Sequence, residues 1–495
     1  MMTRLIILAI LFISITTFGQ TSLSKDERLR EVEIIKASWI ALHPGLLRYN
    51  TQAQINQYFE TLKNQVSNPI TNEQYFILLS QLATKVKCGH TYLNPWNQTE
   101  ETTNTFFSNS YIPFLYKVID RKFIINHNLS EHANIKAGDE IISINGVKVK
   151  RIIDSLLTVS RSDGKNRLAK MLDNINIVPI DIDTTNFALF DIYYPMFFPK
   201  NMKQTIYDFE IKPFRKESYK ISTKSLTKAQ RQEKYVSKFG EIPVHEKNWE
   251  YKLLKPNVAY LRLGDFETWE WKADYKKYLD SVFGVTINAK AENLIIDIRG
   301  NEGGDDDART EVLSYIANKP FGCENPMKRL YKFLAIPDTL LPYLKTWNKE
   351  FKELKKEKDY IKFNGYYEKI DTTKISCQPT NPKSNNFKGK VFLLTNANNS
   401  STTFTMADIF KNYSFGKIVG EPTGGTKQGL NGGQFFFLRL PFSKFEIDLP
   451  IIYGAPTKNR PDEAITPDYL ITTKQSDIYF NRDTQIEFIL KKIKE

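Results

Sequence analysis

The sequence has few cysteines and few histidines, and both shortages limit the disulfide bonds, imidazole bases and metal sites that it can form. Only three of its 495 residues are cysteine, so a disulfide scaffold is excluded and at most one bridge is possible. Only five residues are histidine, which leaves few candidates for an imidazole base. We predict no metal site and no cofactor, because zinc needs more ligands than the sequence clusters.

Long apolar runs are also missing. The longest covers residues 5–15, about half of what a membrane-spanning helix needs. Arg4 precedes this run and Thr16-Thr17-Phe18-Gly19 follows it, a pattern typical of a signal peptide. We predict cleavage after Gly19, no integral membrane segment in the mature protein, and export to the periplasm or the extracellular medium. The alternative is an uncleaved N-terminal anchor.

The net charge of +13 is not concentrated in one place. Lysines are scattered in short clusters such as 355–358 and 491–494, without the interleaved aromatic residues of a nucleic-acid-binding surface. We therefore expect the charge to serve solubility, and we predict no nucleic acid partner. The oligomeric state is left open.

Hydrophobic periodicity divides the chain into regions. Residues 25–84 show apolar positions three and four apart, which predicts a helical N-terminal region over residues 20–100. From residue 251, strand-like segments such as 293–299 and 390–395 alternate with helical ones, so we predict a mostly parallel sheet at 248–480. In such sheets the chemistry lies beyond the carboxyl ends of the strands.

Residues 135–147 resemble part of a PDZ domain. The turns Gly138-Asp139 and Asn145-Gly146 enclose a short alternating strand, as in the family pattern. The resemblance implies a β-rich PDZ-like domain over 108–172, which would bind an extended peptide at a sheet edge. The alternative is a hairpin that only packs. Residues 173–247 follow no clear pattern and are predicted to be a linker or lid.

Two predicted strand ends carry candidate chemistry. The glycine-rich segment Gly300-Asn301-Glu302-Gly303-Gly304 follows one strand, where backbone N–H groups can point at a ligand. The segment Ser400-Ser401-Thr402-Thr403 follows another and begins a helix, where free N–H groups favour a developing negative charge. Alternatively, the first segment is a plain turn and the second an ordinary helix cap.

Together these segments resemble the C-terminal-processing (tail-specific) and tricorn-core-like serine peptidases of family S41. The resemblance covers residues 111–470 and rests on the segments 294–304, 401–425 and 465–468. It implies a multidomain α+β fold with a helical N-terminal region, a PDZ-like domain and an α/β, crotonase/ClpP-like catalytic core. It also implies a serine endopeptidase that hydrolyses protein or peptide substrates through an acyl-enzyme.

The resemblance also implies roles for residues around the two strand ends. Ser401 matches the family nucleophile, and the backbone N–H groups of Gly303, Gly304 and Thr402 would form the oxyanion hole.

The resemblance offers two candidates for the general base and one for the carboxylate that orients it. His90, in Gly89-His90-Thr91, matches one branch of the family, and Lys427 matches the branch that uses a Ser–Lys dyad. We favour His90, because an imidazole titrates near pH ~6.5 without tuning, whereas a lysine base must be buried. Glu463 lies where the tricorn-like branch places its carboxylate, and we propose that it orients His90.

One position departs from the family pattern. Phe404 stands where an acidic residue usually follows the nucleophile. A second function is therefore kept open: a catalytically inactive relative that binds a hydrophobic ligand or a peptide.

Overall fold

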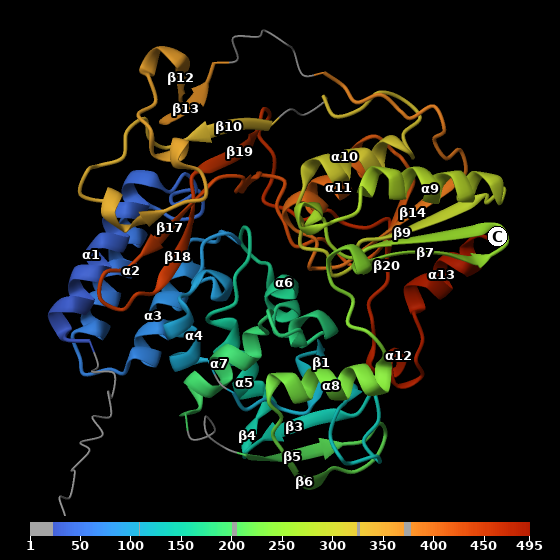
Figure 1. The fold of residues 1–495 in the computed structure, drawn as a ribbon, viewed down its shortest axis with the longest axis horizontal. Coiled ribbons are helices and arrows are strands. Elements are labelled where there is room, and N and C mark those ends of the chain that lie inside the picture. The colour runs from blue at the N-terminus through green and yellow to red at the C-terminus, as the bar shows by residue number, and fades with distance from the viewer. Residues whose placement is uncertain (1–22, 108, 200–204, 324–326, 371–377) are drawn as a thin grey trace, which may run out of the picture.

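The computed structural model describes residues 23–107, 109–199, 205–323, 327–370 and 378–495 (Figure 1). The predicted signal peptide, residues 1–19, lies outside these ranges. Among the described residues, no helix has both the length and the hydrophobicity needed to cross a bilayer. The architecture is a multidomain mixture of helices and several sheets, as expected.

Helices build the N-terminal region, drawn in blue in Figure 1. The first three are capped at their N-termini by Ser24, Thr51 and Thr71, each of which forms a reciprocal capping box with a Glu or Gln three residues later. The loop after the third helix carries His90. The four helices are α1 (Lys25–Leu42), α2 (Gln52–Val66), α3 (Asn72–Lys85) and α4 (Glu100–Phe106).

A six-stranded antiparallel sheet forms the second region, in the order β1-β2-β3-β5-β6 with β4 paired to β3. Its strands are β1 (Phe114–Ile119), β2 (Lys122–Asn128), β3 (Glu140–Ile144), β4 (Val147–Lys148), β5 (Ile206–Lys212) and β6 (Tyr219–Lys224), and its helices are α5 (Val149–Leu157), α6 (Leu168–Asp173), α7 (Leu189–Phe197) and α8 (Lys228–Phe239). The prediction of a linker or lid at 173–247 is wrong for β5 and β6, because β3 pairs with β5 and the two strands complete this sheet.

The third region is an α/β core around a second six-stranded sheet, in the order β20-β15-β14-β9-β8-β7. All neighbours are parallel except β7 and β8. The strands are β7 (Trp249–Lys255), β8 (Val258–Leu263), β9 (Asn293–Asp297), β14 (Lys390–Thr395), β15 (Lys417–Gly420) and β20 (Tyr469–Leu470).

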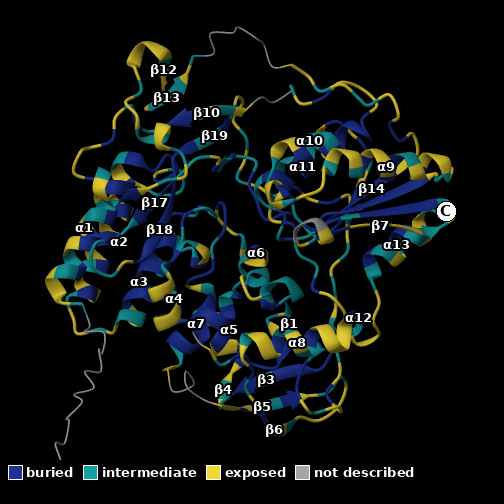
Figure 2. Ribbon diagram, viewed as in Figure 1, coloured by how far each residue is buried: buried dark blue, intermediate teal, exposed yellow. Residues whose placement is uncertain are grey.

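Helices cover both faces of this sheet, which explains why its central strands contain consecutive apolar residues, 294–296 in β9 and 391–394 in β14. Leu294 and Ile296 pack beneath one helical layer, whereas Ile295 packs on the opposite face against Ile489. The buried strands are dark blue in Figure 2. The first layer is α9 (Tyr275–Asn288), α10 (Asp306–Ser314) and α11 (Ser401–Asn412); α13 (Thr484–Lys492) covers the other face, and α12 (Gln475–Tyr479) precedes it.

Two smaller sheets join the N-terminal helices to the core. One has the order β12-β13-β10-β19-β16 and the other β11-β17-β18. Phe445, which immediately precedes β18, packs edge-on against Phe76 of α3, with ring centroids 5.1 Å apart. This packing joins α3, and the loop that follows it, to the β11-β17-β18 sheet. The strands are β10 (Met327–Tyr331), β11 (Leu344–Lys345), β12 (Tyr360–Phe363), β13 (Tyr366–Lys369), β16 (Leu430–Asn431), β17 (Phe435–Arg439), β18 (Glu446–Pro450) and β19 (Ile452–Pro456).

Candidate active site

Ser401 lies on a strained turn between a strand and a helix. β14 ends at Thr395 and α11 begins at Ser401, whose φ of +50° is in the left-handed region. A residue with a Cβ rarely adopts this conformation, which costs roughly 1–3 kcal/mol and clusters at functional sites. A strained strand-to-helix turn is also the device that presents a nucleophilic hydroxyl above a sheet. The strain therefore distinguishes Ser401 from Ser400.

A glycine turn after β9 touches Ser401. Gly303 and Gly304 have φ values of +125° and +133°. A Cβ added to Gly303 would lie 2.8 Å from the Cβ of Ser401 and 3.0 Å from the amide nitrogen of Thr402. The two strand ends are therefore in contact, and only glycine fits at position 303.

Buried asparagine and threonine side chains hold the two turns together. The Asn399 side-chain amide donates to the Asn301 carbonyl at 3.0 Å, and the Thr403 hydroxyl donates to the same carbonyl at 2.9 Å. The Asn301 side chain donates to the carbonyl of Leu263, at the end of β8, at 3.0 Å. Sequence analysis gave no role to Asn301, Asn399 or Thr403. The signal was their position within the two recognised segments.

Two of the three predicted oxyanion-hole N–H groups are free. The amide of Gly303 donates to the Asn301 side-chain oxygen at 2.8 Å. The amides of Gly304 and Thr402 donate to no other residue in the described part of the chain. Thr402 is the second residue of α11, where a backbone N–H has no partner within the helix. The N–H groups available to bind an oxyanion are therefore those of Gly304 and Thr402. Gly303 instead allows the two turns to approach each other closely.

His90 lies on the loop after α3, half-buried, with its ring 5.8 Å from that of Phe435. Its Nδ1 atom is buried and has no hydrogen-bond partner among the described residues. Burial lowers the pKa of His90 below its ordinary value, and the charge of Asp163 opposes that shift. The imidazole is therefore held mainly in its neutral form, which can accept a proton.

Asp163 is a carboxylate that lies close to His90. Possible ligand atoms of Cys88, His90 and Asp163 all lie within 4.8 Å of one another. Asp163 is 6% exposed, and its Oδ1 accepts from the Gly89 amide at 2.8 Å. Sequence analysis missed Asp163, because it lies in the second region with no recognised motif around it.

A network of charges connects the His90 loop with the serine turn; the Lys170 side chain in it is 5% exposed, whereas the Glu302 side chain is 44% exposed. Glu302 accepts from Lys170 at 2.6 Å and from Arg161 at 3.0 Å. Burial alone would raise the pKa of Glu302, but Lys170 and Arg161 outweigh it and lower the pKa to about 2, with a smaller contribution from His90. The Ser400 hydroxyl donates to the Glu302 carbonyl at 3.1 Å. Glu302 thus connects the imidazole loop with the nucleophile turn.

Glu463 and Lys427 pair with each other. Lys427 Nζ lies 3.0 Å from Glu463 Oε2, and the Glu463 side chain is 60% exposed. The amide of Lys427 also donates to the Glu463 carbonyl at 2.9 Å. In this exposed ion pair the ammonium and the carboxylate contact each other. The structure therefore gives neither residue the surroundings that its predicted role requires.

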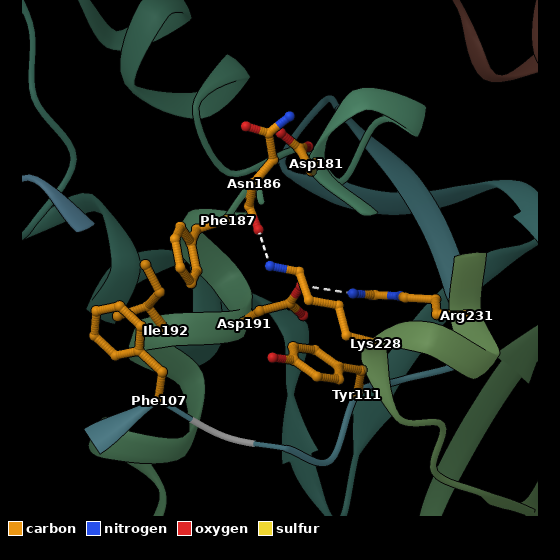
Figure 3. Close-up of a pocket in the computed structure, with 9 residues that line it drawn as sticks. All are labelled: Phe107, Tyr111, Asp181, Asn186, Phe187, Asp191, Ile192, Lys228 and Arg231. Carbon is orange, nitrogen blue, oxygen red and sulfur yellow. Dashed lines mark hydrogen bonds and ion pairs between the residues drawn. The ribbon is translucent and has the colours of Figure 1, made fainter. Parts of the chain in front are cut away.

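Phe404 is part of the packed core. It is 3% exposed and packs against Gly425, where an added Cβ would lie 2.5 Å from its ring. The pocket drawn in Figure 3 lies elsewhere, beside α7 and α8, and has a volume of about 10 Å³, room for one water. Its lining includes Asp181, Asp191, Lys228 and Arg231. Such a pocket does not suit a hydrophobic ligand.

Comparison with known proteins agrees with this site. Residues 257–434 match the model of peptidase family S41, so both the glycine turn and Ser401 lie inside the match. The predicted resemblance to serine peptidases of this family is confirmed. No curated protein matches the sequence.

Solved structures share the fold over nearly the whole chain. Mature CPAF complexed with lactacystin has a TM-score of 0.62 and 13% identity, over 95% of this chain and 98% of that one. Mature CPAF has a TM-score of 0.60 and 14% identity, over 95% of this chain and 96% of that one. At this identity the likeness is one of fold.

Proposed function

This chain carries a serine-peptidase core of family S41, and we propose that Ser401 is its nucleophile. The observation that carries the proposal is the strained turn at Ser401, in contact with Gly303 and beside two free backbone N–H groups. A hydroxyl held in this way lies next to donors for the oxyanion that its attack creates.

The reaction uses His90 as the general base. His90 takes the proton of the Ser401 hydroxyl while the oxygen attacks a peptide carbonyl, and the N–H groups of Gly304 and Thr402 bind the oxyanion. The protonated imidazole then gives its proton to the leaving amine, and an acyl-enzyme remains. Water, deprotonated by His90, hydrolyses this ester and restores Ser401.

Asp163 replaces Glu463 as the orienting carboxylate in this proposal. It is buried beside the imidazole, and its charge favours the protonated form that appears during the reaction. Glu463 is exposed and already paired with Lys427. Nδ1 of His90 makes no hydrogen bond to Ser401 or to any other described residue. In ligand-free enzymes such catalytic bonds are often loose and tighten when substrate binds.

Substrate and location are part of the proposal. The substrate is a protein or peptide, and the sheet of β1–β6 acts as a PDZ-like unit that holds a peptide end. An extended peptide adds to a sheet at an edge strand, and the edges of this sheet are β1 and β6. The N-terminal signal pattern supports export to the periplasm or the medium.

The test is labelling of the purified mature protein with a fluorophosphonate serine-hydrolase probe. Ser401→Ala should abolish labelling, and the matched control Ser400→Ala should retain it. His90→Ala should suppress labelling and Lys427→Ala should not. Lactacystin, present in the structure of one fold neighbour, should compete if it reaches Ser401. Labelling that persists in folded Ser401→Ala would remove Ser401 from the scheme.

A further inference from the structure

A free cysteine, a histidine and an aspartate meet in one buried place beside the proposed catalytic centre. Cys88 is a free thiol, 3% exposed, and Asp163 is 6% exposed. Possible ligand atoms of Cys88, His90 and Asp163 all lie within 4.8 Å of one another. No role in peptide hydrolysis has been given to Cys88. We propose that these three side chains form a zinc site that inhibits the peptidase, an inference that rests on the function proposed above.

The donor set suits zinc. Sulfur, nitrogen and oxygen are its usual protein ligands, and three protein ligands with one open position form a recurring arrangement. Tetrahedral bond lengths of about 2.0–2.3 Å place neighbouring donors roughly 3.4–3.6 Å apart. The three side chains must therefore close by at most about 1.2–1.4 Å, which rotation of the side chains can supply.

An unpartnered buried atom points independently to a ligand. Nδ1 of His90 is buried and makes no hydrogen bond to a described residue. Leaving such an atom unpaired costs roughly 1–3 kcal/mol. A cation bound there would remove this cost. Sequence analysis predicted no metal site because Cys88 and His90 had no third ligand in the sequence around them; the fold brings Asp163 to them from the loop that precedes α6.

The atoms around the three side chains are arranged to support a bound cation. The Asn431 side-chain amide donates to Cys88 Sγ at 3.3 Å, which stabilises negative charge on the sulfur. The Gly89 amide donates to Oδ1 of Asp163, so that Oδ2 is left for a metal. Partners of this kind orient ligands and typically raise metal affinity. Arg161 and Lys170 are balanced by Glu302 and Asp163, and loss of the Cys88 proton to solvent on binding adds a further negative charge.

Zinc binding and catalysis would exclude each other. A neutral imidazole has one nitrogen with a lone pair, and zinc would occupy it. The other nitrogen then carries the proton, so that His90 cannot take the proton of Ser401. The site would therefore act as a reversible brake on the enzyme, released when zinc is removed.

The first part of the test measures metal binding without reference to activity. Full-length mature protein is titrated with Co²⁺, whose bond to a thiolate gives a charge-transfer absorption band in the near ultraviolet. We expect one equivalent bound with this band, which Cys88→Ser should lack. His132→Gln, which changes a histidine outside the cluster, should bind as wild type. Zinc affinity, measured by competition with a chromophoric chelator, should fall at least about tenfold in Cys88→Ser.

The second part measures inhibition as a ratio, so that differences in basal activity cancel. For each variant, the fluorophosphonate labelling rate with added zinc is divided by the rate with a chelator. The ratio should be far below one in wild type and His132→Gln, and should return toward one in Cys88→Ser. An equal ratio in wild type and Cys88→Ser, or no thiolate band with Co²⁺, would overturn the zinc site. A Cys88-dependent band in a protein whose Ser401 is never labelled would retain the metal site and reject the proposed function.

Discussion

Two groups of paired charges in this molecule look alike in composition and differ in what surrounds them. One lies at the proposed site and contains Glu302, Lys170 and Arg161. The other lines the pocket of Figure 3 and contains Asp191 and Arg231, whose ion pair is 2.6 Å long.

The surroundings decide which group is functional. The site group borders a strained serine, two free backbone N–H groups and an unpartnered imidazole nitrogen. The pocket group encloses space for about one water and touches no strained or nucleophilic residue. Buried charge alone is thus a weak signal of function, since structural ion pairs also perturb pKa values. Unsatisfied donors beside a strained hydroxyl are the more specific signal.

The largest expected effect is at the site. Asp163→Asn keeps the shape of the side chain and can still accept from the Gly89 amide, but it loses the charge that holds the imidazolium. We expect the fluorophosphonate labelling rate to fall on the order of 10³-fold, with little change in melting temperature. Asp462→Asn, which alters a carboxylate bound to Arg167, is the matched control. A wild-type labelling rate in Asp163→Asn would return the orienting role to another carboxylate.

Removing a charge from the pocket should lower the stability of the fold and leave the labelling rate unchanged. Asp191→Asn leaves the Arg231 guanidinium, 1% exposed, without its counter-charge. We expect unfolding free energy to fall by about 3–5 kcal/mol in chemical denaturation, while the labelling rate per folded molecule stays unchanged.

A double variant tests whether the loss of unfolding free energy in Asp191→Asn comes from the unpaired charge of Arg231. Asp191→Asn combined with Arg231→Met removes both charges and should regain much of the stability. A slower labelling rate in folded Asp191→Asn would contradict the separation between the two groups of charges.

Glycine substitutions sharpen the comparison within the site. Gly303→Ala places a Cβ 2.8 Å from that of Ser401, whereas at Gly300 nothing lies within 4 Å of an added Cβ. Both glycines have positive φ, so both alanines share the backbone strain. We expect labelling to fall about 100-fold in Gly303→Ala, through displacement of the turn that carries the Gly304 donor, and to remain near wild type in Gly300→Ala. Equal losses in the two variants would mean that strain alone matters.

Much of the mixed α/β architecture could be predicted from the sequence, and the structure brings two of the predicted site segments, those of Gly303 and Ser401, into contact. The apolar spacing of residues 25–84 and the segments at 294–304 and 401–425 could be recognised because each is encoded within a few neighbouring residues. Asp163 could not be recognised as a site residue from the sequence, because it comes close to His90 only when the second region packs against the loop after α3. Glu463 and Lys427 were assigned roles from their positions along the chain. Position alone does not determine the partner of a charged side chain, and in the structure the two residues form an ion pair with each other.

The range 173–247 shows the same limit in the fold. β5 and β6 are half-exposed strands with mixed polar and charged residues, so the region had no continuous apolar signal. Their place in the sheet depends on pairing with β3, more than 60 residues earlier in the chain. The two small sheets around β10–β13 were missed for the same reason, since long-range pairing defines them.

The smallest expected effect is a pH dependence of the unfolding free energy that arises in the pocket and not at the proposed site. Burial raises the pKa of Asp181, in the pocket, from 3.8 to about 7, and the charge of Asp191 adds to the shift while Arg231 opposes it. The folded state therefore holds a proton that the unfolded state has released, so this residue's contribution to stability falls as pH rises through 7. We expect a loss of about 1.4 kcal/mol between pH 6 and pH 8, measured as the difference in unfolding free energy between wild type and Asp181→Asn. The asparagine can still accept from the Val178 amide, so it serves as an uncharged reference. Labelling of Ser401 per folded molecule should be the same in both proteins at each pH, because Glu302 at the site, with its pKa lowered to about 2, stays ionised throughout this range.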